Sequence, residues 1–266
     1  MRRIDLGGKL VVVTGASSGL GREIARSLAL QEHADLVIAA RRSDRLLELK
    51  TDIEARCASH VHVLPVDLAE PEGALALFNG ALAVGDVFAL VNCAGITFYG
   101  RTLEASIEMC ERIVTVNLVS EMKATLLFLR HFLERGAGAI LTVTSMSAFV
   151  PAPFQNVYAA TKHGMQAFME GLAREYRGSG ITFSTFVPGG MATEMNTLAG
   201  LDKKFKMDSP VNMDPKKAAR LAVASFTRGK LRAVPGLMYR TVIFLLRLVP
   251  SSMVSWIMGR LYAPPS

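Results

Sequence analysis

A tyrosine and a lysine stand four positions apart in the stretch YAATK, as Tyr158 and Lys162. Residues at i and i+4 share one face of a helix, so both side chains would point in the same direction. A nearby ammonium group favours the phenolate form of a phenol. Such a tyrosine can give a proton to a carbonyl oxygen as hydride reaches the carbon, and can take it back in the reverse reaction. The pair is a weak signal alone, since surface helices contain it by chance.

The stretch TGASSGLG, residues 14–21, offers a site for phosphate groups. Gly15, Gly19 and Gly21 would let the backbone turn tightly and approach a pyrophosphate, whose charge is favoured by the N–H groups at a helix start. The hydroxyls of Ser17 and Ser18 can add contacts. A glycine-rich turn without a ligand is the alternative, and the apolar run before the loop and the helical pattern after it argue against that alternative.

Two arginines, Arg41 and Arg42, follow the second apolar run in AARRSDRL. An NAD site usually presents an acid here to the ribose 2′-hydroxyl, and an acid would repel a 2′-phosphate. A guanidinium group can pair with that phosphate through two hydrogen bonds, so the arginines favour NADP(H) over NAD(H). The alternative is that they are solvated residues at the start of a helix.

Six apolar runs rich in Val, Ile and Leu are spaced along the chain, with helical patterns between them. The runs are mostly continuous, which is typical of strands covered on both faces, and the alternating order predicts an α/β fold with a single-domain, Rossmann-type, doubly wound parallel sheet. The longest helices are expected at about 105–135 and 155–178. The runs cover residues 9–15, 34–40, 60–66, 87–95, 138–145 and 181–189.

Further motifs give the tyrosine and lysine their context. Ser145 ends the fifth run in LTVTS, and Asn117 lies in VTVNLV. With TGASSGLG, NCAG at 92–95, YAATK and PGGMAT at 188–193, the chain resembles the short-chain dehydrogenase/reductase family, in the subgroup with TGxxxGxG and YxxxK motifs. The resemblance runs from about residue 8 to 195, and six motifs in the right order make it specific.

The resemblance implies roles for four catalytic residues. Tyr158 matches the general acid/base, and Ser145 matches the serine that orients the carbonyl and steadies its developing negative charge. Lys162 matches the lysine that also holds the nicotinamide ribose. Asn117 matches the asparagine of a proton relay through water.

The resemblance also implies contacts to an NADP(H) cofactor beyond the glycine loop. Arg41 matches the position where NADP-preferring members carry a basic residue, but Ser18 stands where several of them carry a second one. Cys93 replaces the second asparagine of the usual NNAG, a change expected to be tolerated. The full predicted set is Gly15, Ser17, Ser18, Gly19, Leu20, Gly21, Arg41, Arg42, Asp67, Leu68, Asn92, Ala94, Gly95, Tyr158, Lys162, Pro188, Gly189 and Thr193. Glu194, beside this set, is expected to be solvated.

The net charge of +7 is uneven over the 266 residues. Residues 215–266 hold nine basic and no acidic residues, which leaves 21 basic and 23 acidic residues before them. The basic excess is therefore C-terminal, which points to an anionic surface there and not to a nucleic-acid-binding protein. No metal site is expected, because His60 and His62 lack a nearby carboxylate cluster.

The cellular compartment of the protein is predicted from its cysteines and its N-terminal residues. Cys57, Cys93 and Cys110 are odd in number and lack the paired spacing of a zinc or redox site, which is typical of buried thiols in a reducing compartment. The apolar run before Thr14 is too short for the core of a secretory signal. A cytoplasmic location is expected.

Two segments depart from the alternation of strands and helices. Residues 189–214 are irregular and rich in methionine, including Met207, and are expected to form a substrate lid on a catalytic domain of residues 1–234. Residues 235–266 read as two short amphipathic helices hinged at Pro250, with Trp256 and Tyr262 as interfacial aromatic residues. These helices are expected to make peripheral contact with the cytoplasmic face of a membrane, or else to pack on the protein itself or on another subunit.

The resulting prediction is an NADP(H)-dependent oxidoreductase that interconverts a carbonyl and an alcohol on a hydrophobic, lipid-like or polycyclic substrate. The family resemblance implies a homo-dimer or homo-tetramer. One alternative is a 3-oxoacyl thioester reductase of fatty-acid synthesis, which usually lacks so long an apolar basic tail. The other is a cofactor-binding sensor or scaffold without catalysis, which would have no reason to keep all four catalytic residue types.

Overall fold

The structure is a computed structural model that describes residues 3–191, 193–201 and 212–263. For residues 246 and 247 it describes only the backbone. Part of the predicted lid, residue 192 and residues 202–211, including Met207, lies outside the described residues.

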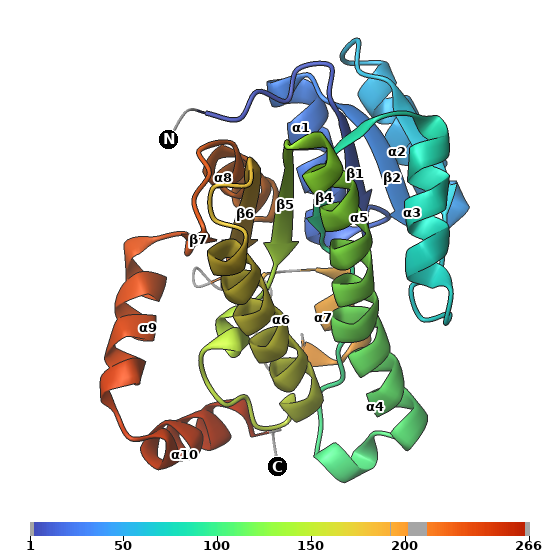
Figure 1. The fold of residues 1–266 in the computed structure, drawn as a ribbon. Coiled ribbons are helices and arrows are strands. Elements are labelled where there is room, and N and C mark those ends of the chain that lie inside the picture. The colour runs from blue at the N-terminus through green and yellow to red at the C-terminus, as the bar shows by residue number, and fades with distance from the viewer. Residues whose placement is uncertain (1–2, 192, 202–211, 264–266) are drawn as a thin grey trace.

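Seven parallel strands form one sheet in the order β3-β2-β1-β4-β5-β6-β7 (Figure 1). Alternate residues of β1 supply both faces: Val11 and Val13 pack on one side and Val12 on the other, all fully buried. Such two-sided burial explains why the strands read as continuous apolar runs. The strands are β1 Leu10–Thr14, β2 Asp35–Ala40, β3 Val61–Pro65, β4 Val87–Asn92, β5 Gly138–Val143, β6 Ile181–Phe186 and β7 Arg232–Ala233.

Helices cover both faces of the sheet. On one face, α1, α2 and α8 bury large side chains such as Leu28, Leu49 and Phe226. On the other face, α3, α5 and α6 bury Phe128 and Met165 among others. The ranges of these helices are α1 Gly19–Glu32, α2 Ser43–Glu54, α3 Gly73–Val84, α5 Glu121–Arg135, α6 Asn156–Glu175 and α8 Pro215–Thr227.

The predicted doubly wound α/β domain is confirmed, and six strands lie where the apolar runs place them. The sequence missed β7, because a two-residue strand has no periodic signal. The predicted helix at 105–135 is also more complex than expected. It consists of α4, Ile107–Val114, a π-helical segment η2, Thr115–Ser120, and then α5.

Two short 3-10 helices and one short α-helix flank the carboxyl edge of the sheet. They are η1 Thr102–Glu104, η3 Met146–Ala148 and α7 Glu194–Leu198. The three cysteines are free thiols, as expected, and each is half-buried.

Two helices, α9 Leu237–Leu248 and α10 Ser251–Tyr262, follow β7 and break at Pro250 as predicted. We call them the C-terminal arm. The arm lies along one side and the lower end of the molecule (Figure 1). In the parts of the chain that the structure describes, no helix has the length and apolar character needed to cross a membrane.

Candidate active site

The order of the strands reverses between β1 and β4, and such a switch point opens a crevice at the carboxyl ends of parallel strands. Thr14 joins the two strand ends. Its hydroxyl oxygen accepts hydrogen bonds from the N–H groups of Cys93, at 3.0 Å, and Ala94, at 3.1 Å, and its O–H donates to the carbonyl of Val91 at 3.3 Å. The glycine loop and the NCAG segment therefore meet at one place.

Two glycines of the loop are required by close backbone approach. Gly15 has φ +69°, and a Cβ there would lie 2.8 Å from the Cα of Ala94. A Cβ on Gly21 would collide with the carbonyl oxygen of Gly15, so the start of α1 packs directly on the end of β1. A bare backbone loop before a helix N-terminus fits a pyrophosphate, which supports a dinucleotide at this site.

The two arginines after β2 differ in their surroundings. The Arg41 side chain is 54% exposed, with its Nη1 atom 4.0 Å from a carboxylate oxygen of Asp67. Arg42 donates two hydrogen bonds to the Glu194 carboxylate, at 2.6 and 2.8 Å, and one to the Ser17 hydroxyl at 3.2 Å. Glu194 is therefore not simply solvated, as the sequence suggested, but pairs with a residue 152 positions away.

The Arg42–Glu194 pair ties the start of α7 to the phosphate end of the crevice. The hydrogen bonds from Arg42 lower the pKa of Glu194 to about 2, against the effect of its partial burial. Next to it, Thr193 lies against the glycine loop: a Cβ on Gly19 would be 3.5 Å from its methyl group. The hydroxyl oxygen of Thr193 is buried and lacks a hydrogen-bond partner within the described chain, as expected of a group that contacts a ligand.

Asp67 and Leu68 lie in the loop after β3. A carboxylate oxygen of Asp67 accepts from the N–H of Ala69 at 2.9 Å. The carbonyl of Leu68 accepts from the hydroxyl of Ser120 at 2.6 Å, which joins this loop to the end of η2. The predicted adenine end of the site is thus fixed from two sides.

Tyr158 and Lys162 occupy one buried face of α6, which the four-residue spacing predicted. The Lys162 ammonium lies 6.0 Å from the centre of the Tyr158 ring. It also donates a hydrogen bond to the carbonyl of Val143, the last residue of β5, at 3.2 Å. The lysine is therefore held against the edge of the sheet.

Ser145 follows β5 by two residues and begins the turn of η3. Its hydroxyl oxygen accepts a hydrogen bond from the N–H of Ser147 at 3.1 Å. Because the acceptor side of the hydroxyl is engaged, its proton is free to be donated to a substrate oxygen. Strand β5 thus positions Ser145 as well as the carbonyl that holds Lys162.

Asn117 lies in the π-helical segment and is fully buried. Its amide nitrogen donates to the carbonyl of Ile96 at 2.8 Å, and its amide oxygen accepts from the N–H of Ile96 at 2.9 Å. π-helical turns inside α-helices are common at functional sites. Here the turn directs Asn117 at the chain that follows β4.

The other predicted contacts include one exception, Asn92. The side chain of Asn92 is buried behind the strand and donates to Thr125 and Thr142, so its side chain does not reach into the crevice. A Cβ on Gly95 would be 3.9 Å from the Lys162 ammonium, which places this backbone beside the reactive pair. Pro188 accepts a hydrogen bond from the N–H of Met146 at 3.3 Å.

The C-terminal arm packs in part on the protein itself, an alternative that the sequence left open, and two of its tyrosines make the contact. The ring of Tyr239, on α9, occupies the space that a side chain at Gly189 would need. The carbonyl of Tyr262, at the end of α10, accepts a hydrogen bond from the Tyr99 hydroxyl at 2.7 Å. Burial raises the pKa of Tyr262, and proximity to Tyr158 and Tyr99 raises it further. The sequence predicted Tyr262 as an interfacial aromatic residue, but the structure places it beside Tyr99 and Tyr158. Contacts between residues so far apart along the chain leave no local pattern.

A second residue that the sequence missed is Glu121. It is 1% exposed, and one of its carboxylate oxygens lies 3.9 Å from the Lys162 ammonium. Burial raises the pKa of Glu121 to about 7, although Lys162 opposes the shift. Burial lowers the pKa of Lys162, but the charges of Glu121, Tyr158 and Cys93 outweigh it and leave the pKa above its ordinary value. The ammonium therefore stays charged at neutral pH.

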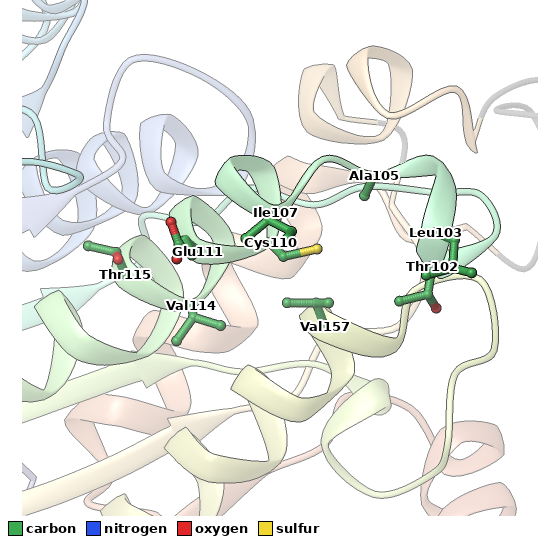
Figure 2. Close-up of a pocket in the computed structure, with 9 residues that line it drawn as sticks. All are labelled: Thr102, Leu103, Ala105, Ile107, Cys110, Glu111, Val114, Thr115 and Val157. Carbon is green, nitrogen blue, oxygen red and sulfur yellow. The ribbon is translucent and has the colours of Figure 1, made fainter.

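A separate open groove of about 700 Å³ lies beside the crevice (Figure 2). It runs between the η1–α4 segment and the start of α6, with Val157, the neighbour of Tyr158, on its wall. Its side chains are largely apolar, and they come from the outer surface of the helices and not from the strand ends. The lining residues are Thr102, Leu103, Ala105, Ile107, Cys110, Glu111, Val114, Thr115 and Val157. We call it the α4–α6 groove.

Within the described ranges, no group of three or more His, Cys, Asp or Glu side chains is arranged to hold a metal ion.

The sequence profile of the short chain dehydrogenase family matches residues 9–204. A curated relative from Drosophila melanogaster, "Dehydrogenase/reductase SDR family protein 7-like", is 29% identical over 97% of this chain and 82% of its own length. "Ketoacyl reductase HetN" from Nostoc sp. is 33% identical over 69% of this chain and 64% of its own.

Solved structures agree with this match. A short-chain dehydrogenase from Sphingobium yanoikuyae in complex with NADPH superposes with a TM-score of 0.82 at 27% identity, over 93% of this chain and 95% of that one. A short chain dehydrogenase/reductase from Burkholderia phymatum in complex with NAD has a TM-score of 0.85 over 99% of both chains. At 20% identity, that second likeness shows the fold alone.

Proposed function

Because this chain belongs to the short-chain dehydrogenase/reductase family, whose members act on hydroxyl and carbonyl groups, we propose that it is an NADP(H)-dependent oxidoreductase for a hydrophobic substrate. The observation that carries the proposal is the fixed Tyr158–Lys162 pair beside Ser145 at the edge of the sheet. Ser145 and the carbonyl that holds Lys162 both lie at the carboxyl end of β5, the strand next to β4.

In carbonyl reduction, Ser145 donates a hydrogen bond to the substrate oxygen and Tyr158 donates the proton to it. A nicotinamide cofactor bound in the crevice would supply the hydride. Lys162 stabilises the tyrosinate left behind, because its ammonium is held nearby by the carbonyl of Val143. Asn117 positions the backbone at Ile96 and completes the predicted path for proton return. The reverse sequence oxidises an alcohol.

The cofactor preference rests on the residues after β2. Gly15 and Gly21 provide the backbone cradle for the pyrophosphate, and Arg41, exposed and held only by a 4.0 Å contact to Asp67, can turn to a 2′-phosphate. No acidic residue occupies the two positions after β2, where an NAD site would present one. These features support NADP(H) over NAD(H).

The substrate class is inferred from the walls of the crevice. Phe154 lines a small cavity together with Tyr158, and the Tyr99 and Phe154 rings are 6.5 Å apart. Tyr262 of the C-terminal arm lies close enough to Tyr158 and Tyr99 to raise its own pKa, and Tyr239 of the arm lies against Gly189. An apolar and aromatic wall favours a lipid-like or polycyclic carbonyl. The similarity to a ketoacyl reductase keeps a 3-oxoacyl thioester as the second candidate.

Turnover assays of the purified protein test the cofactor preference and the substrate class together, with NADPH or NADH and two kinds of carbonyl substrate. Lipid-like ketones such as 2-decanone and a 3-ketosteroid form one set, and acetoacetyl-CoA represents the thioesters. We expect NADPH oxidation with the first set and a lower kcat/KM with NADH. A higher kcat/KM for acetoacetyl-CoA would favour the thioester reductase instead.

The C-terminal arm is proposed to contact an anionic membrane surface from the cytoplasmic side. Among its described side chains only Ile243 and Val254 are buried, while many large apolar ones are exposed. Arg260 stacks on Trp256, with 4.1 Å from the guanidinium carbon to the ring centre, an arrangement suited to an interface between apolar and charged groups. The exposed set is Leu237, Met238, Val242, Phe244, Leu245, Leu248, Met253, Trp256, Ile257 and Leu261.

The α4–α6 groove is proposed as a contact between copies of this chain. Leu103 at its rim is 98% exposed and Ile107 is 73% exposed, so a partner would bury apolar surface there. A homo-dimer or homo-tetramer is therefore expected. Light scattering after size-exclusion chromatography measures the state directly, and a monomer at micromolar concentration would contradict it.

A further inference from the structure

Glu121 is a buried carboxyl group that the proposed reaction does not use. It is the first residue of α5, immediately after the π-helical segment that carries Asn117. Neither of its carboxylate oxygens has a hydrogen-bond partner in the described chain. A buried carboxylate without hydrogen bonds is costly, and an apolar residue would usually fill such a position at lower cost. The contact between Glu121 and Lys162 offers a reason why a carboxyl group occupies this position.

The surroundings of the Lys162 ammonium suggest what that role is. The ammonium donates to Val143 at 3.2 Å, faces the Tyr158 ring at 6.0 Å and lies 3.9 Å from Glu121. Lys162 is itself buried, so solvent does not screen these contacts. The charge of the Glu121 carboxyl group therefore acts directly on the Lys162 ammonium, which faces Tyr158.

Resting on the proposed function, we propose that Glu121 is a positioning residue that acts through Lys162. Its carboxyl group holds the ammonium in place from one side, and its charge state sets how strongly the ammonium stabilises the tyrosinate of Tyr158. When Glu121 is protonated, Lys162 acts with its full charge. When Glu121 is ionised, the pair is nearly neutral and the tyrosinate is less favoured.

Apart from Lys162, which stays charged, the neighbouring ionisable groups stay neutral over the range in which Glu121 changes charge. Burial raises the pKa of Glu121 to about 7. Burial also raises the pKa of Cys93 to about 12, with Lys162 opposing it, so this thiol stays protonated. The pKa values of Tyr99 and Tyr262, on the far side of Tyr158, are raised by burial as well.

Substitution of Glu121 tests the proposal through the pH dependence of turnover. Glu121→Gln keeps the shape and removes the charge, while Glu121→Asp keeps the charge on a shorter side chain. The readout is kcat/KM against pH, in both directions, with the alcohol and ketone pair that the panel above finds fastest. We expect Glu121→Gln to move the midpoint to lower pH by about one unit in both directions, because the unopposed ammonium favours the tyrosinate. Glu121→Asp should restore most of the original midpoint.

A purely structural role predicts a different result. Activity would then fall by the same factor at every pH in Glu121→Gln, and the midpoint would stay in place. That outcome, or a shift to higher pH, overturns the proposal.

A second measurement does not depend on turnover. Infrared difference spectra of the cofactor-free protein, recorded across neutral pH, should contain a carboxylic-acid band that titrates with a midpoint near 7 and is missing in Glu121→Gln. Absence of this band in the wild-type protein overturns the proposal even if the enzyme is active. Presence of the band in a protein that reduces no carbonyl would instead refute the proposed function, so the two failures are distinguishable.

Discussion

Helix α6 and the C-terminal arm both contain many apolar residues but use them in opposite ways. α6 buries Met165, Met169 and Leu172 against the sheet, and so fixes Tyr158 and Lys162 on the same face. The arm leaves most of its large apolar side chains exposed and is tied to the crevice mainly through tyrosines. The comparison separates a part built to hold reacting groups still from a part whose apolar surface is available to something outside the chain.

The largest effect should come from the fixed part. Tyr158→Phe removes the proton donor and leaves the packing of α6 unchanged, so kcat for ketone reduction should fall about 10³-fold or more. NADPH binding, followed by its fluorescence, should stay within about twofold because the pyrophosphate cradle is untouched. Turnover at the wild-type rate would show that Tyr158 is not the proton donor.

The next effect tests the arm. Phe244→Ser combined with Trp256→Ser removes two exposed apolar side chains, and binding to vesicles containing phosphatidylglycerol should weaken about tenfold to hundredfold. Vesicle flotation or co-sedimentation measures the change.

A matched control uses apolar side chains that are even more exposed but lie outside the arm. Leu103→Ser combined with Ile107→Ser, on the α4–α6 groove, should leave vesicle binding unchanged and alter the oligomeric state. Equal losses of vesicle binding in both double variants would show that the arm binds membranes no better than the rest of the surface does.

A smaller effect is expected where the later part of the chain meets the phosphate end. Glu194→Gln releases Arg42 from its ion pair and removes a negative charge near the proposed 2′-phosphate position. KM for NADPH should fall about twofold to fivefold, as befits a partly exposed pair, while KM for NADH stays constant. Since the pKa of Glu194 is lowered to about 2, the effect should be the same throughout the neutral range. A parallel rise in the KM values for NADPH and NADH would mean that the Arg42–Glu194 pair instead holds α7 against the glycine loop.

The smallest effect compares two glycines in helix interiors. A Cβ on either Gly171, in α6, or Gly259, in α10, would meet no atom within 4 Å. Gly171→Ala should raise the free energy of unfolding by about 0.5–1 kcal/mol. Gly259→Ala should leave it unchanged if the arm opens before the rest of the chain, and should only slow hydrogen exchange in α10. Equal gains in both would show that the arm unfolds together with the sheet.

The sheet and the catalytic face were predictable because each depends on a short repeat in the sequence. Continuous apolar runs predicted six strands, and the four-residue spacing predicted that Tyr158 and Lys162 share a face. Strand β7 was missed because two residues give no periodicity. The π-helical segment was missed because its residues fit an ordinary helical pattern equally well.

The polar contacts over long distances were not predictable in the same way. A glutamate in a helix is normally exposed, so Glu121 gave no sign that it would be buried beside Lys162. Arg42 reads as a phosphate ligand from its local motif, and its pairing with Glu194 appears only when α7 is placed over the glycine loop. Such contacts depend on which loops fold over the crevice, and local patterns carry no information on that.

The hydrogen bond from Tyr99 to the carbonyl of Tyr262 has a mechanical consequence. A swing of α10 about Pro250 would break this bond and move Tyr262 away from Tyr158, so the space beside the reacting tyrosine depends on where the last helix lies. A surface that restrains the outer side of α10 would therefore also limit that space.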